Sequence, residues 1–202
     1  MTTREKILDA SLRLFAERGF DSVSLRQIAA AVGIRESSLY NHFKNKQELF
    51  DTIVETCFQR AEAYFHSRSL PFSQSDDLSV LTSRDPSALY ASVLAIFEYF
   101  FTDEYNVLFR KLLTLSQFQS GRARTIYRWL YVDYPLAFQT HLFEKLIQTG
   151  ELKPSSPGDL ATEFYGAVFL FIHACDSFEE ARPRILAHLR NFLQNHQSEV
   201  PS

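Results

Sequence analysis

The sequence has few of the residues that build several common kinds of site. Its two cysteines, Cys57 and Cys175, lie far apart without Cys-x-x-Cys spacing, which predicts buried free thiols rather than a disulfide framework or a thiolate zinc site. No glycine loop that could cradle phosphate, no nucleophile elbow and no di-iron Glu-x-x-His pair is present. We therefore expect no cofactor and no enzymatic activity.

Long apolar runs and a secretory signal are also missing. The longest apolar run, residues 164–172, is too short to cross a bilayer, and the N-terminus is amphipathic and charged. We expect a cytoplasmic protein with no membrane partner. His141 with Glu144, and His173 with Asp176, have helical i, i+3 spacing, but a metal site usually needs three or four ligands, so we predict no metal.

What the chain does have is apolar and aromatic residues. They make up 46% and 14% of its 202 residues, enough to bury a substantial core in one small and one larger domain. Helical periodicity runs along the whole chain, and no segment alternates like a strand. The sequence predicts an all-α fold of about nine helices.

A short stretch that begins at Ser24 reads as two helices joined by a glycine turn. Ser24 and Gln27 form a capping box, Ala29 is small where the helices approach, and Gly33 suits the turn. Leu39 is an apolar residue that should anchor the buried side of the second helix. We predict a helix-turn-helix whose outward polar side chains can touch phosphates and base edges. A helical hairpin with a solvated polar face is the alternative.

Neighbouring segments support this interpretation. Thr2 and Glu5 form another capping box, which starts a helix that runs to about Arg18, where Gly19 suits a left-handed end. Residues 1–50 carry eight Lys or Arg against six acids, a charge of +2 that leaves -5 for the other 152 residues. So small a basic surplus predicts modest nonspecific affinity for double-stranded DNA, with a strong dependence on salt.

The first fifty residues resemble the DNA-binding domain of the TetR (tetracycline repressor) family of bacterial regulators. The resemblance rests on Ile28-Ala29, Val32-Gly33-Ile34, Leu39-Tyr40, His42-Phe43 and Lys46. It implies that Tyr40 and His42 approach the DNA backbone, that Lys46 meets a phosphate, and that residues 36–38 and 41 read bases. The candidate DNA-binding residues are Arg26, Arg35, Glu36, Ser37, Ser38, Tyr40, Asn41, His42 and Lys46.

Two of these residues leave the base preference open. Many family members have glycine where this chain has Ser37, at a position that comes very close to the groove. Glu36 could accept a hydrogen bond from cytosine N4 or be repelled outward by phosphates.

The predicted domains are residues 1–46, which bind DNA, and 47–202, which bind a ligand and dimerise. A linking helix covers about 46–66 and a flexible loop about 67–85, and Pro135 should kink or split a long helix of about 122–149. The helix that follows Ser156 is apolar on nearly every side, so one side should pack on a second subunit. The candidate interface residues are Phe164, Val168, Phe171, Ile185, Leu189 and Phe192.

The resemblance implies a homodimer held by a four-helix bundle, to which each subunit contributes its last two helices. The two recognition helices, one from each subunit, would lie about 34–36 Å apart on a palindromic site. It also implies a ligand cavity in the body, where 24 of the 29 aromatic residues lie. Most aromatic stripes are core, but tyrosines among phenylalanines favour an apolar or aromatic effector. The candidate ligand-binding residues are Phe97, Phe101, Tyr105, Phe109, Tyr127, Tyr131, Tyr165, Phe169 and His173.

The leading hypothesis is a ligand-responsive transcriptional regulator, most simply a repressor. The alternative is a helical small-molecule binder whose N-terminal motif has lost operator recognition, as Ser37 would permit. A purely structural dimer is the third possibility, but it leaves Arg26, Asn41 and Lys46 without a task.

Overall fold

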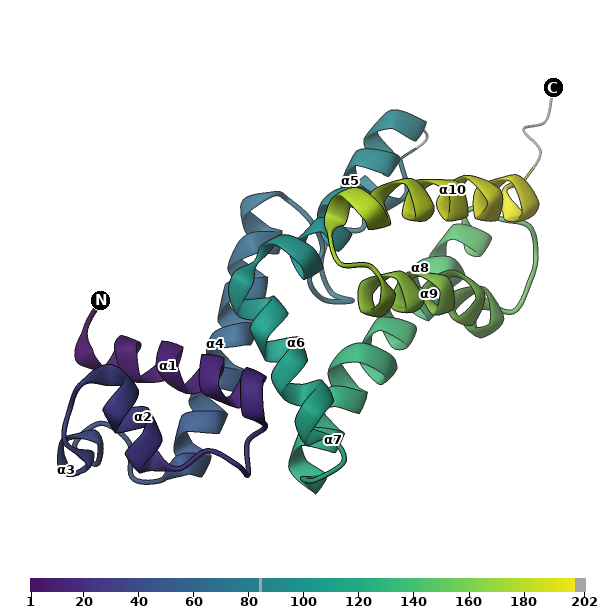
Figure 1. Ribbon diagram of the computed structural model, residues 1–202. Coiled ribbons are helices and arrows are strands. Elements are labelled where there is room, and N and C mark those ends of the chain that lie inside the picture. The colour runs from purple at the N-terminus through teal and green to yellow at the C-terminus, as the bar shows by residue number, and fades with distance from the viewer. Residues whose placement is uncertain (84, 199–202) are drawn as a thin grey trace. The chain divides into compact units, whose positions relative to one another are not determined.

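The computed structural model describes residues 1–83 and 85–198, and this part of the chain is helical (Figure 1). Its α-helices are α1 Thr3–Arg18, α2 Leu25–Val32, α3 Glu36–Leu39, α4 Lys46–Ser67, α5 Pro86–Thr102, α6 Glu104–Ser116, α7 Gly121–Arg128, α8 Tyr134–Gln148, α9 Pro157–Ala174 and α10 Phe178–His196. The described residues form no strand beyond one isolated bridge between Leu152 and Gln197. No helix among them is long and apolar enough to span a membrane. The predicted all-α fold is confirmed.

Contacts divide the chain into two compact units. The first contains Met1–Glu62 and Asp103–Arg128, and the second contains Ala63–Thr102 and the described residues from Trp129 onward. The predicted boundary after residue 46 divides the chain by expected function. By packing, α6, α7 and most of α4 belong with the N-terminal helices. Helix α6, expected to belong to the ligand-binding body, is thus a neighbour of α1.

The first unit is organised around α1. Both predicted capping bonds are present, since Thr2 N donates to Glu5 Oε2 at 2.8 Å and Glu5 N donates to Thr2 Oγ1 at 3.3 Å. Gly19 ends the helix with φ +81° and ψ 155°, so its φ is positive as expected but the residue is not left-handed helical. Phe15, on the buried side, is fully enclosed.

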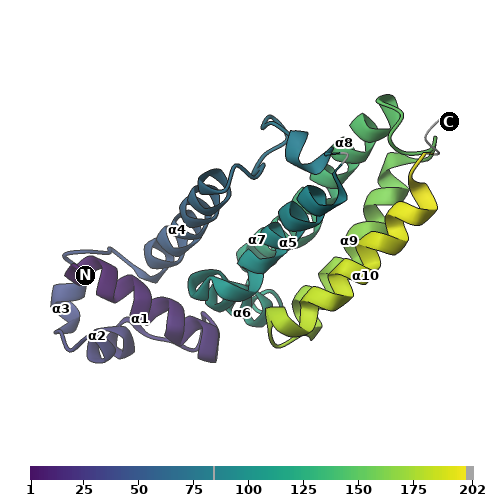
Figure 2. The ribbon, with the colours of Figure 1, turned by 90° about the horizontal axis from the view of Figure 1, so that it is seen from above.

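The second unit is built from α5, α8, α9 and α10. Helices α9 and α10 lie side by side (Figure 2), and their inner faces bury Val168 and Ile185. Phe164 on α9 and Phe192 on α10 have ring centroids 5.2 Å apart. Apolar burial of this kind supplies most of the stabilisation of a helical domain. Both cysteines are free and buried, as predicted.

The long helix predicted over about 122–149 is divided, as Pro135 indicated. A π-helical turn, Trp129–Asp133, separates α7 from α8, and Pro135 occupies the first turn of α8, where its missing N–H costs nothing. Further back, the segment expected to be a flexible loop buries Leu78 and Leu81 and contains a 3-10 turn, Ser79–Leu81. That segment therefore contributes to the core of the second unit.

Candidate nucleic-acid interface

The predicted helix-turn-helix is formed by α2 and α3. Its start is fixed by the capping box, in which Gln27 N donates to Ser24 Oγ at 3.3 Å and Ser24 N donates to Gln27 Oε1 at 2.7 Å. Gly33 ends α2 in the left-handed conformation, with φ +76° and ψ 30°. A side chain at that position would be strained, which is why glycine suits this turn.

Helix α3 is short, but the chain keeps turning beyond it. His42 N and Phe43 N both donate to Leu39 O, at 2.9 and 3.0 Å. Leu39 and Phe43 are 0% and 1% exposed, so one side of this segment is anchored in the core. The opposite side must then face solvent, because residues about four apart share one helical face.

The candidate DNA-binding residues lie on or near that outer side, with one exception. Tyr40 is 50% exposed although it is a large aromatic residue. Ser38 and His42 are half-buried. The other exposed candidates are Arg26, Arg35, Glu36, Ser37 and Asn41. These side chains offer the donors, acceptors and positive charge that phosphates and base edges require.

Arg4 contacts the segment of residues 36–43 through Phe43, a contact that the sequence did not predict. Its guanidinium carbon lies 4.7 Å from the centroid of the Phe43 ring, so a cation from α1 sits beside the recognition segment. Nothing in local spacing relates residues 4 and 43, because the contact depends on how α1 packs.

Lys46 is the exception. Its ammonium Nζ donates to Phe20 O at 2.9 Å, Val23 O at 3.0 Å and Asp21 O at 3.4 Å. The resemblance implied a phosphate contact, but in this structure the side chain turns back to the protein's own backbone.

The start of α4 is capped by its own residues. Asn45 Oδ1 accepts from Glu48 N at 2.8 Å, and Glu48 Oε2 accepts from Lys44 N at 2.6 Å. The Glu48 carboxylate also suits the positive end of the helix dipole. This end of α4 is therefore well defined before any ligand binds.

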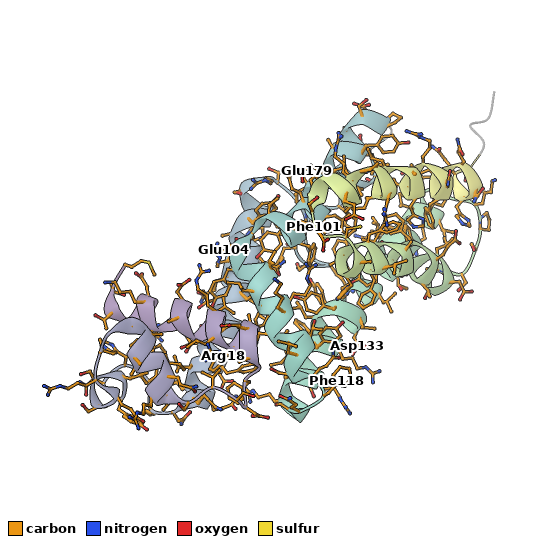
Figure 3. The ribbon with its side chains drawn as sticks, in the orientation of Figure 1. Arg18, Phe101, Glu104, Phe118, Asp133 and Glu179 are labelled. Carbon is orange, nitrogen blue, oxygen red and sulfur yellow. The ribbon has the colours of Figure 1, made fainter. Side chains whose placement is uncertain are left out.

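Helices α6 and α7 contact α1 and α4 through polar pairs within the first unit. Glu104, at the start of α6 (Figure 3), pairs with Arg13 of α1 at 2.8 Å. Arg122 of α7 pairs with Asp51 of α4 at 2.6 Å. Both pairs are largely exposed, so each contributes little to the free energy of unfolding.

The candidate ligand-binding aromatics divide between the two units. Tyr105, Phe109 and Tyr127 belong to the first, where Phe109 is fully buried in the core. The other six belong to the second unit. An open hollow of about 300 Å³ in the second unit is lined by none of the nine; its lining is Asp77, Leu78, Ser79, Thr82, Lys145, Gln148, Thr149 and Glu151.

Four of the aromatic candidates do gather around α9. Tyr165 OH donates to Tyr131 O at 2.9 Å, and the rings of Phe169 and His173 have centroids 4.1 Å apart. The Tyr131 and His173 rings meet edge to face at 6.0 Å. This cluster combines apolar surface with polar tips, beside the π-helical turn.

The candidate dimer residues lie mostly in the core of the second unit. Five of them are at most 5% exposed, namely Phe164, Val168, Ile185, Leu189 and Phe192, and only Phe171 is half-buried. They contact their own domain, so they do not offer a surface to a second subunit. The sequence showed that α9 is apolar all round but not which side would face inward.

The outer stripe of α9 is apolar as well, and it remains exposed. Gly166, Leu170 and Ala174 follow one another at four-residue spacing, and Leu170 is 59% exposed. The small residues Gly166 and Ala174 would let another helix approach closely, and Leu170 between them offers that helix an apolar side chain to pack against.

Comparisons with known proteins agree with this geometry. Residues 7–53 match the family model described as bacterial regulatory proteins, tetR family. The chain is 42% identical over 55 residues to the biofilm operon icaADBC negative transcriptional regulator IcaR of Staphylococcus epidermidis. That match covers 27% of this chain and 30% of IcaR.

Solved structures extend the likeness in fold to nearly the whole chain. A putative TetR-family transcriptional regulator from Rhodococcus sp. superposes with a TM-score of 0.67 at 19% identity, over 95% of this chain and 98% of that one. AibR, solved with isovaleryl coenzyme A and operator DNA, gives 0.64 at 21% identity, over 92% and 97%. Residues 7–53 therefore match the tetR family of bacterial regulatory proteins, and the fold of nearly the whole chain is shared with these solved structures.

Proposed function

We propose that this protein is a ligand-responsive transcriptional repressor that binds a palindromic operator as a homodimer. The observation that carries the proposal is the outer side of residues 36–42, where exposed polar side chains lie over the anchors Leu39 and Phe43. A segment anchored this way presents its side chains to the major groove. Arg26 and Arg4 add cations for the phosphate backbone.

The homodimer is proposed to form through the outer stripe of α9, which is Gly166, Leu170 and Ala174, with α10 beside it. Ala187 of α10 is likewise exposed. An isologous interface of two such helix pairs would bury the stripe of each subunit and relate the two helix-turn-helix motifs by a two-fold axis. These residues replace the buried ones as the proposed interface.

The effector is proposed to be a small, largely apolar or aromatic molecule bound beside Tyr131, Tyr165, Phe169 and His173. IcaR is named a negative regulator, and AibR was solved with both a ligand and operator DNA, which supports a repressor that responds to a ligand. An effector can release DNA only if it binds the released state more tightly than the bound one. A role at an operator is one in the cytoplasm, which is therefore the proposed location.

Selection from a random pool of duplex DNA tests this function. The purified protein should enrich a palindrome whose half-sites lie about 10 base pairs, one helical turn, apart centre to centre. A pool that stays random after repeated rounds would contradict operator recognition and favour a small-molecule binder with a degenerate N-terminal domain.

A further inference from the structure

Lys46 occupies a position that is electrostatically unfavourable for a cation. It is the first residue of α4, where the helix dipole places partial positive charge. Its side chain is nevertheless half-buried rather than extended into water. Acceptor groups of the protein must therefore stabilise the positive charge of the Lys46 ammonium.

The turn between α1 and α2 provides that compensation. An ammonium has three N–H donors and no acceptor, and the carbonyl oxygens of Phe20, Asp21 and Val23 lie 2.9, 3.4 and 3.0 Å from Nζ. The same Nζ lies 4.5 Å from the centroid of the Phe20 ring, which adds a cation–π contact. The donors of Lys46 are thus matched by acceptors within one four-residue turn.

This turn determines how the reading helices leave α1. It follows Gly19, the residue that ends α1, and it leads directly into Ser24, the N-cap of α2. Fixing the turn against α4 therefore fixes where α2, and with it α3, sits in the first unit.

We propose that Lys46 is a positioning residue: it clamps the Phe20–Val23 turn onto α4 and sets the orientation of α2 and α3, instead of binding a DNA phosphate. The consequence for affinity rests on the proposed DNA-binding function. The clamp itself is a property of the DNA-free protein. The two can therefore be tested apart.

Salt dependence separates the clamp from a phosphate contact. A lysine that neutralises one phosphate of duplex DNA contributes about 0.9 to the slope of log affinity against log salt concentration. Lys46→Met keeps the aliphatic stem and removes the charge. The clamp predicts that this variant binds a fixed DNA duplex more weakly at every salt concentration with an unchanged slope, whereas a slope lower by about 0.9 overturns the proposal.

Hydrogen exchange in the absence of DNA tests the clamp directly. The amides of Phe20 and Ser24, which side chains of Ser116 and Gln27 protect, should exchange faster in Lys46→Met. Lys44→Met is the matched control, because its ammonium has the same charge and its main chain, not its side chain, is held by Glu48. Unchanged exchange at residues 20–24 in Lys46→Met overturns the proposal.

A second variant keeps the test decisive if Lys46→Met does not fold. Lys46→Arg retains the charge, but its planar guanidinium cannot direct three donors from one nitrogen to three carbonyls. The clamp predicts faster exchange at residues 20–24 in this variant, and a phosphate role predicts none. If the wild-type protein shows no salt-dependent DNA binding, the proposed function fails while the exchange result still decides the clamp.

Discussion

The backbone amide of Phe20 donates to Ser116 Oγ at 3.2 Å, which joins the turn after α1 to the last residue of α6. Ser116 is 1% exposed and Phe20 is half-buried, so this bond is partly shielded from water. The turn is thus held from two sides, by Ser116 of α6 and by Lys46 of α4. A displacement of α6 within the first unit would act directly on the segment that carries the reading helices.

Replacing Ser116 by alanine should weaken this unit. The part-buried Phe20 amide would lose its acceptor, and we expect a loss of about 1 kcal/mol in the free energy of unfolding, measured by urea titration. Ser92→Ala is the control, since that hydroxyl makes an exposed hydrogen bond back to Ala88 O along its own helix, and it should change stability by less than about 0.5 kcal/mol. Equal effects of the two variants would contradict the role given to Ser116.

Leu170→Glu should separate the proposed homodimer. A carboxylate in the middle of the apolar stripe on α9 would have to be buried without a partner, which is strongly unfavourable. Sedimentation velocity should show the variant as a monomer at concentrations where the wild type is a dimer. Leu115→Glu, at a leucine 46% exposed on α6, should leave the dimer intact; dissociation by both or by neither variant would argue against this interface.

Asn41 and Tyr40 should differ in how they affect DNA recognition. Asn41→Ala removes a side chain proposed to read bases and should reduce discrimination between the selected duplex and a scrambled one by about 1–3 kcal/mol. Tyr40→Phe removes a hydroxyl proposed to touch the backbone, so both duplexes should bind more weakly by the same factor. Fluorescence anisotropy with each duplex measures both effects. Loss of discrimination in Tyr40→Phe alone would reverse the assignment.

Asp76 should contribute to stability above acid pH. Its Oδ2 accepts from Phe72 N at 2.7 Å and Ser73 N at 2.8 Å, and these bonds to backbone amides of Ser73 and Phe72 lower the pKa of the carboxyl. A lowered folded pKa gives stability that is complete above the unfolded pKa of about 3.9 and is lost as pH falls through the folded pKa.

The variant Asp76→Asn isolates this contribution, because an amide oxygen can still accept from the backbone but does not titrate. The free energy of unfolding of the wild type should fall more steeply than that of the variant below about pH 4. Parallel curves in urea titrations from pH 6 to pH 2.5 would show that Asp76 does not have a lowered pKa.

The features that the sequence predicted well are encoded within a few residues. Thr2 with Glu5 and Ser24 with Gln27 are three apart and form their capping boxes as expected. Gly33 and Pro135 act through their own backbone geometry, so the turn and the divided helix could also be expected. The whole helix-turn-helix follows from such local rules.

The features that were missed or misplaced depend on long-range packing. Periodicity identified α9 as apolar on nearly every side, but it cannot say whether Phe164 or Leu170 faces the domain's own core. In the same way, the spacing of Tyr105 and Phe109 indicated a stripe without showing that it packs in the first unit. Lys46 matched a family pattern, and only the fold shows that its ammonium reaches residues 20–23.

The most direct test of the central claim is an anisotropy titration of the purified protein with duplex DNA from its own upstream region, over a series of salt concentrations. A sequence-specific regulator should bind this duplex more tightly than a scrambled duplex of equal length, with affinity that falls steeply as salt rises. Equal binding of both duplexes with a flat response to salt would contradict the account.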